Sequence, residues 1–217
     1  MDQPRAGFRL LPVSLKQAIN LSDPETLEFT PEDYFTPVRV EELFARTAPL
    51  QVDVGCGEGA FIVAMAKLHA EMNFLGIERL VGRVRKVCKR AVNAKVENVR
   101  VMCVEIAYTV QHLLPKESVS VLHVMFPDPW PKRKHRKNRL VNHEFLDAVH
   151  AALTGEGELR LTTDDLDYFQ WMQKVAAGHK GFAAVPWPDD PAYPMTDFEK
   201  RFRAQGLPIY RLLLRKV

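Results

Sequence analysis

The chain has 217 residues, 47% of them hydrophobic, which suits one large globular domain with a full core. Its net charge is only +3, so a nucleic-acid partner can be inferred only from where basic residues cluster. The three cysteines are far apart and show no Cys-x-x-Cys spacing, which argues against a disulfide framework or a zinc site. No signal peptide or apolar membrane span is evident, and we expect a cytoplasmic protein.

Residues 1–48 carry no sustained hydrophobic period, and we expect a partly ordered N-terminal extension with a short helix near 38–45. From residue 50 onward, segments typical of strands and of helices alternate. Apolar runs predict strands at 50–54, 73–77, 98–104, 119–126, 158–162 and 207–214. Helical spacing of apolar residues predicts helices at 58–69, 80–94, 142–153, 164–177 and 196–205. The alternation predicts an α/β fold with a mostly parallel sheet covered on both faces.

A glycine-rich turn follows the first predicted strand, where residues 53–59 read Asp-Val-Gly-Cys-Gly-Glu-Gly. Glycines let a ligand approach the backbone at the carboxyl end of a strand. Gly55 and Gly57, with Ala60, fit the dinucleotide pattern G-x-G-x-x-[G/A], so an NAD-dependent oxidoreductase is one alternative. The carboxylate of Asp53 favours S-adenosylmethionine instead, because an acid complements its sulfonium and ammonium groups but repels pyrophosphate.

Two further carboxylates follow the next two predicted strands. Glu78 is placed to accept hydrogen bonds from ribose hydroxyls of either cofactor. Glu105 is placed to accept a hydrogen bond from an adenine amino group. The competing interpretation of Glu78 is a solvated residue that caps the following helix, and that of Glu105 is a residue that faces solvent.

The segment 126–131, Phe-Pro-Asp-Pro-Trp-Pro, follows the fourth predicted strand. Its prolines lack amide donors and fix φ, so it is neither a helix nor a central strand. We interpret it as a rigid loop at the ligand end of the sheet. Asp128 lies between two prolines, which reduces the entropy lost on ordering it and suits substrate placement. The alternative is a stiff turn with a solvated acid.

Six of the eight residues 132–139 are Lys or Arg, a run suited to phosphate binding. Its candidate substrate-binding residues are Lys132, Arg133, Lys134 and Arg136. A second group of cations shares one side of the predicted helix 80–94, and we interpret it as a solvated face rather than a binding site. Its members are Arg79, Arg83, Lys86 and Arg90.

Taken in chain order, the motifs resemble the bacterial single-subunit tRNA (guanine-N7-)-methyltransferase family. They are 52–57, 76–78, 126–130 with Lys132 and the basic run, Thr162-Thr163-Asp164, and Thr-Asp-Phe-Glu at 196–199. The resemblance extends from Pro49 to the C-terminus. The Pro-Asp-Pro-Trp loop and the late Thr-x-Phe-Glu motif are its specific parts, whereas many methyltransferases share the glycine loop.

The resemblance implies a Rossmann-like class I methyltransferase domain over 49–217, with a seven-stranded sheet whose last strand is antiparallel. It implies methyl transfer from S-adenosylmethionine to N7 of guanine 46 in the tRNA variable loop, by a monomer or homodimer without a metal or an obligatory protein partner. The cofactor-site candidates are Asp53, Gly55, Gly57, Glu78, Glu105 and Asp128. By the family pattern, the residues that contact the tRNA or its target base are Lys132, Asp164, Thr196 and Glu199.

Guanine N7 has a free lone pair and no proton to lose, so the reaction needs no general base and depends mostly on positioning. The guanine becomes cationic as the methyl group arrives. Asp128 and Asp164 are therefore the catalytic candidates, as carboxylates that stabilise this charge. The chain departs from the family where Asp53 replaces a common Glu, Glu105 replaces the usual Asp, and Asn138 interrupts the basic run. A methyltransferase for another RNA or a small molecule, an oxidoreductase and a non-catalytic RNA-binding domain are the competing hypotheses.

Overall fold

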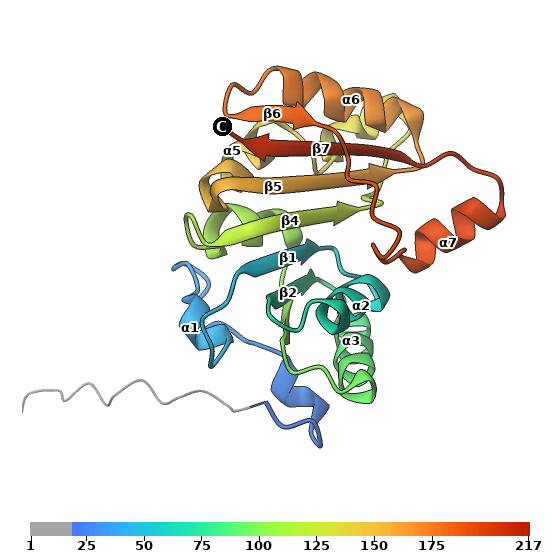
Figure 1. The fold of residues 1–217 in the computed structure, drawn as a ribbon. Coiled ribbons are helices and arrows are strands. Elements are labelled where there is room, and N and C mark those ends of the chain that lie inside the picture. The colour runs from blue at the N-terminus through green and yellow to red at the C-terminus, as the bar shows by residue number, and fades with distance from the viewer. Residues whose placement is uncertain (1–18) are drawn as a thin grey trace, which may run out of the picture.

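The computed structural model describes residues 19–217, which form a seven-stranded sheet with helices on both faces (Figure 1). The strand order is β3-β2-β1-β4-β5-β7-β6. Strands β1 to β5 are parallel, β7 is antiparallel to β5, and β6 is antiparallel to β7. The strands are β1 Leu50–Val54, β2 Asn73–Glu78, β3 Val99–Cys103, β4 Val119–Met125, β5 Leu153–Thr163, β6 Phe182–Val185 and β7 Tyr210–Lys216.

Two hydrophobic cores lie on opposite faces of the sheet. Helices α2 and α3 pack on one face, and α5, α6 and the π-helical turn η2 pack on the other. The helices are α1 Val40–Leu43, α2 Ala60–Leu68, α3 Val81–Ala94, α4 Ile106–Tyr108, α5 His143–Ala152, α6 Leu166–Ala177 and α7 Asp197–Ala204. The shorter turns are η1 Pro24–Leu27, η2 Thr109–Leu113 and η3 Arg133–Asn138. No helix within 19–217 is long and apolar enough to cross a membrane.

The central strand β1 is buried along its whole length, as its position between β2 and β4 requires. Because side chains alternate across a strand, Leu50, Val52 and Val54 all point into the α5–α6 core. The intervening Gln51 and Asp53 point to the other face. This alternation places the side chain of Asp53 near the C-terminal end of β1, on the face covered by α2 and α3.

The predicted α/β fold is confirmed, including the antiparallel last strand. Several details differ from the sequence-based expectation, two of them in the second half of the sheet. Strand β5 begins at Leu153, directly after α5, and therefore starts well before the strand predicted at 158–162. Strand β6 was not located from the sequence, because its four residues Phe-Ala-Ala-Val are too few for a period-2 pattern to show.

The segment before β1 packs onto the sheet in its described part. Phe29 donates its amide hydrogen to the carbonyl of Val101 at 2.8 Å, and Leu27 is fully buried. The buried Arg100 side chain donates from Nε to the carbonyl of Leu43 at 2.7 Å, which joins this segment to β3. The partly ordered extension expected over 1–48 stays a prediction for residues 1–18, which lie outside the described residues.

Candidate functional site

Five acidic residues lie at or just after the carboxyl ends of neighbouring parallel strands. Asp53 lies in β1 and Glu78 ends β2, whereas Glu105, Asp128 and Asp164 follow β3, β4 and β5. The order β3-β2-β1-β4-β5 makes these strands a continuous row, so the structure collects five of the six sequence-predicted carboxylates at the carboxyl ends of neighbouring strands. Ligands of doubly wound sheets bind at this carboxyl edge.

The glycine loop between β1 and α2 has a left-handed backbone at three positions. Gly55, Gly57 and Gly59 have φ values of 78°, 57° and 80°. A Cβ atom at Gly59 would lie 2.8 Å from Cγ1 of Val87, so this glycine lets the loop pack against α3. A Cβ atom at Gly57 would meet nothing closer than the Gly55 carbonyl oxygen at 4.0 Å. Gly57 therefore faces open space, and the loop leaves room there for a ligand.

Asp53 is only 4% exposed, and its carboxyl group has no hydrogen-bond partner among residues 19–217. Burial, and then the nearby carboxylate of Glu78, raise the pKa of Asp53 to about 7. Glu78 is equally buried, but Oε1 accepts hydrogen bonds from the amides of Arg79 and Leu80 at 2.9 and 3.0 Å. Two buried carboxyl groups beside a glycine loop favour a ligand that carries positive charge and hydroxyl donors.

S-adenosylmethionine fits these features, since it carries an ammonium, a sulfonium and a ribose. The unpaired carboxyl of Asp53 suits the cationic part, and the free space beside Gly57 suits close approach to the backbone. Glu105 is a weaker candidate for ligand binding than the sequence suggests. It is exposed, and its Oε2 accepts the amide hydrogen of Tyr108 at 2.7 Å, which caps α4.

The Pro-Asp-Pro-Trp loop is strained at both ends. Phe126 and Trp130 have φ values of 55° and 46°, a left-handed conformation that is costly for bulky residues. The Phe126 amide hydrogen bonds to the carbonyl of Thr162 at 2.8 Å, which ties the loop to the end of β5. Asp128, between these strained residues, is exposed and has no hydrogen-bond partner in the described part of the chain. The Pro-Asp-Pro-Trp loop therefore presents the unpaired carboxylate of Asp128 beside the glycine loop.

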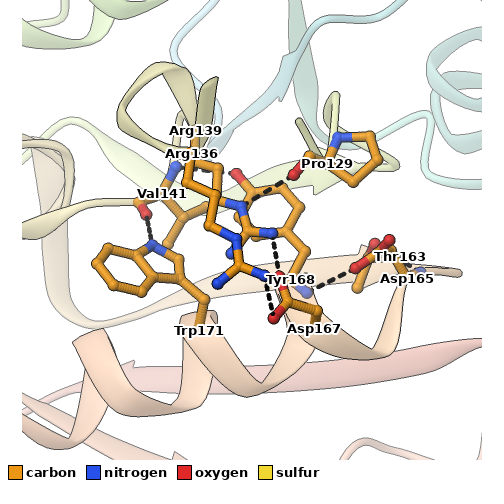
Figure 2. Close-up of polar contacts among 9 residues, drawn as sticks. All are labelled: Pro129, Arg136, Arg139, Val141, Thr163, Asp165, Asp167, Tyr168 and Trp171. Atoms are coloured by element: carbon orange, nitrogen blue, oxygen red, sulfur yellow. Dashed lines mark hydrogen bonds and ion pairs between the residues drawn. The ribbon is translucent and has the colours of Figure 1, made fainter. Parts of the chain in front are cut away.

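Arg139 hydrogen bonds to this loop from its side chain, although it belongs to the basic run in the sequence (Figure 2). Its side chain is only 2% exposed. Its Nε donates to the carbonyl of Pro129 at 2.9 Å, and its guanidinium pairs with Asp167 and lies 4.9 Å from the ring centre of Tyr168. The hydrogen bond from Arg139 lowers the pKa of Asp167 and keeps this partner ionised. Arg139 is thus a structural clamp between the loop and α6.

The basic run divides into two parts. Lys132, Arg133 and Lys134 are exposed and have no carboxylate partner within residues 19–217. Arg136 is half-exposed and pairs with Asp167 at 2.9 Å, beside the buried Arg139 (Figure 2). The exposed residues 132–134 can therefore bind phosphates, whereas Arg136 and Arg139 form ion pairs with Asp167 of α6.

Helix α7 brings the remaining predicted residues to the same edge of the sheet. Thr196 caps the helix, because its Oγ1 accepts the amide hydrogen of Glu199 at 2.9 Å. Glu199 is only 3% exposed. The ring of Phe202 lies 5.4 Å from that of Phe126, so α7 lies against the start of the Pro-Asp-Pro-Trp loop. The structure thus joins two motifs that are about 70 residues apart in the sequence.

A buried histidine fixes the chain that leads into α7. His123 of β4 is 1% exposed and hydrogen bonds to Gln51 at 2.9 Å and to the hydroxyl of Tyr193 at 3.0 Å. Burial, and then the nearby Arg160, hold the pKa of His123 well below its usual value, so the ring stays neutral. In the sequence His123 only interrupts an apolar run, and nothing there identifies its distant partners.

The basic surface formed by Arg79, Arg83, Lys86 and Arg90, which we call the α3 stripe, has several of its residues close to carboxylates. Lys86 contacts Glu58 of the glycine loop at 2.5 Å, and Arg90 lies 3.8 Å from Asp197 of α7. Arg83 lies 3.5 Å from the buried Glu78. These carboxylates offset much of the stripe's charge, in line with our interpretation that it is not the main binding surface.

The solved structures most relevant to this architecture are methyltransferases. The 16S rRNA methyltransferase KamB has a TM-score of 0.62 and 15% sequence identity, with 82% of this chain and 92% of that chain covered. An S-adenosylmethionine-dependent O-methyltransferase from Thermotoga maritima has a TM-score of 0.52 and 16% identity, covering 79% of this chain and 60% of that one. The fold is therefore that of the class I methyltransferases.

Sequence relatives define the family within this class. A family model described as putative methyltransferase matches residues 47–212. The tRNA (guanine-N(7)-)-methyltransferase of Syntrophotalea carbinolica is 34% identical over 183 residues, which are 82% of this chain and 79% of that protein. The enzyme of the same name from Halorhodospira halophila is 35% identical over 185 residues, with the same coverage. The chain belongs to the tRNA (guanine-N(7)-)-methyltransferase family, whose members are S-adenosylmethionine-dependent enzymes. Membership of this family decides against the alternative of an NAD-dependent oxidoreductase.

Proposed function

We propose that the enzyme transfers a methyl group from S-adenosylmethionine to N7 of guanine 46 in the variable loop of tRNA. The observation that carries this proposal is the meeting of two specific motifs at one edge of the sheet. The Pro-Asp-Pro-Trp loop and the Thr-x-Phe-Glu helix both lie beside the glycine loop and its acids. The names of the relatives support tRNA as the substrate. We further propose a cytoplasmic enzyme that acts as a monomer or homodimer.

The cofactor would be held by the ends of β1 to β4. Asp53 would complement its positive charge, and Gly55 and Gly57 would let it approach the backbone. Glu78, whose Oε1 is fixed by two backbone amides, would accept hydrogen bonds from the ribose hydroxyls. Glu105 and Asp128 would complete the site on either side of these residues. When bound, S-adenosylmethionine supplies an electrophilic methyl group on its sulfonium.

The chain's task toward guanine is to orient it and to stabilise its new charge. N7 attacks with a lone pair and releases no proton, so none of the acids has to act as a base. Asp128, which is exposed and unpaired, and Asp164, which is half-buried after β5, would stabilise the cationic product ring. Rigidity of the 126–130 loop serves this role, because an acid held in place loses little entropy when it acts.

The RNA backbone would be bound by the free part of the basic run. Lys132, Arg133 and Lys134 offer unpaired cations immediately after the loop, and Arg136 adds a partly compensated one. Such contacts position an RNA without reading its sequence. Selection of the base would therefore fall to other residues, among them Thr196 and Glu199 at the start of helix α7.

The proposal is tested with the purified enzyme, radiolabelled S-adenosylmethionine and two unmodified tRNA transcripts. One transcript has guanosine at position 46, and the other has adenosine there. We expect one 7-methylguanosine per molecule in the first transcript and none in the second, as measured by nucleoside analysis. Absence of label in both would contradict methylation of tRNA. Equal labelling of the two transcripts would contradict guanine 46 as the site of methylation.

A further inference from the structure

Helix α7 buries one side chain, and that side chain is charged. Within Asp197–Ala204, only Glu199 is buried, while Phe198 remains 43% exposed. A surface helix ordinarily packs through an apolar stripe. A buried carboxylate in that place costs free energy unless it is paired, so its partners determine how α7 sits on the sheet.

Two arginines share a single oxygen of this carboxylate. Arg203 donates to Oε1 from Nε at 2.9 Å and forms an ion pair with it, and Arg211 donates to the same oxygen from Nη2 at 2.6 Å. Oε2 has no partner in the part of the chain that the structure describes. The carboxylate is therefore fixed through one oxygen, and the other oxygen keeps its lone pairs for a further donor.

The two arginines differ in what holds them. Arg203 is on α7 itself and is half-exposed, so it moves with the helix. Arg211 belongs to β7, where it lies opposite Thr162 of β5, and its guanidinium lies 5.2 Å from the ring centre of Trp187. Thr162 is the residue whose carbonyl accepts the Phe126 amide of the Pro-Asp-Pro-Trp loop. Arg211 thus ties Glu199 to the same strand end that supports Asp128.

We propose that Arg211 is a positioning residue for recognition of the acceptor base, an inference that rests on the proposed function. It fixes Oε1 of Glu199 so that Oε2 accepts a hydrogen bond from the exocyclic amine of guanine. Adenine has no amine at that position, so the contact discriminates between the two purines. A site built around such a hydrogen bond rejects analogues that lack the donor, because its own polar group then stays unpaired.

The test uses tRNA transcripts with guanosine or inosine at the acceptor position. Inosine keeps N7 and N1–H and lacks only the exocyclic amine. We compare the wild type with Arg211→Gln, Arg211→Lys and the matched control Arg203→Gln. Single-turnover rates are measured with saturating S-adenosylmethionine, together with the dissociation constant of that cofactor and the KM for tRNA.

For the wild type we expect inosine to slow methylation by at least about tenfold. Arg211→Gln should lower the guanosine rate by about 10- to 100-fold and reduce the inosine penalty to within about twofold of unity. Its cofactor affinity should stay unchanged, because the cofactor residues lie on other strands. Arg211→Lys should regain part of both the rate and the penalty. Arg203→Gln should keep the wild-type penalty.

A structural role alone would lower both rates together and leave the inosine penalty in place, and that result would overturn the inference. Equal rates for guanosine and inosine in the wild type would overturn it as well. So would a parallel loss of cofactor affinity in Arg211→Gln and Arg211→Lys, since it would indicate general disruption. Failure of the proposed function is a distinct result, because the wild type would then methylate neither transcript.

Discussion

Asp53 combines deep burial with a carboxyl group that has no hydrogen-bond partner among the described residues. Its pKa of about 7 means that the free enzyme holds a proton there below neutrality. A cationic cofactor favours the ionised form, so cofactor binding and loss of this proton are linked. An ordinary aspartate keeps a constant negative charge above about pH 5, but the charge of Asp53 still changes around pH 7.

We therefore expect the affinity for S-adenosylmethionine to rise by up to about tenfold between pH 6 and pH 8, as Asp53 changes from mostly protonated to mostly ionised. Isothermal titration calorimetry measures this directly. Asp53→Asn is the control, because it keeps the shape and removes the titration. The cofactor's own amine also titrates near pH 8 and affects both proteins alike. An identical pH dependence in both would contradict a role for Asp53 ionisation.

Gly57 and Gly59 share a left-handed backbone but differ in their surroundings, so alanine should affect them differently. Gly59→Ala would place Cβ 2.8 Å from Val87 Cγ1, and we expect a loss of about 2–4 kcal/mol in unfolding free energy. Gly57→Ala meets only open space and should cost about 1–2 kcal/mol of strain. Its new methyl group would instead obstruct the cofactor and weaken binding by at least about tenfold. Denaturant unfolding and calorimetry separate the two effects, and equal losses of stability would contradict this distinction.

Among the structural elements, the loop at 126–131 depends on α6 through Arg139. Arg139→Met should remove the contacts to Pro129 and Asp167 while leaving the half-exposed Asp167 solvated and paired with Arg136. We expect kcat to fall by about 10- to 100-fold, because Asp128 loses its fixed position, with a much smaller change in the KM for tRNA. Arg136→Met is the control and should leave kcat within about twofold. Steady-state kinetics checks both variants, and equal effects on kcat would contradict a clamp specific to Arg139.

Local patterns in the sequence were sufficient to predict most of the elements and the edge where the acids meet. Non-local pairing was not predictable in the same way. Arg139 reads as one more cation of the basic run, and only the packing of α6 against the loop shows that it is buried. Arg211 lies within a predicted strand, but its pairing with Glu199 depends on strand register and on where α7 lies. Similarly, the cap that Glu105 forms on α4 went unpredicted, because that short helix carries no clear hydrophobic period.

At the scale of the whole molecule, charge is concentrated beside the site even though the net charge is only +3. Two basic surfaces lie at the carboxyl edge, the exposed start of the 132–139 run and the α3 stripe. Carboxylates contact the α3 stripe at Lys86 and Arg90, whereas Lys132 and Lys134 have no such partners within residues 19–217. An RNA phosphate would displace counterions from the unpaired residues, but at the stripe it would have to compete with fixed acids.

This difference predicts two salt dependences. We expect Lys132→Ala combined with Lys134→Ala to reduce the slope of log K against log salt for tRNA binding by about 1.4–1.8, as each lost phosphate contact removes roughly 0.7–0.9. Lys86→Ala combined with Arg90→Ala removes the same formal charge and should change the slope by less than about 0.5. Fluorescence anisotropy with labelled tRNA across a range of KCl concentrations measures both. If the two double variants changed the slope equally, the α3 stripe would have to count as part of the RNA-binding surface, and the acids beside it could not be neutralising it.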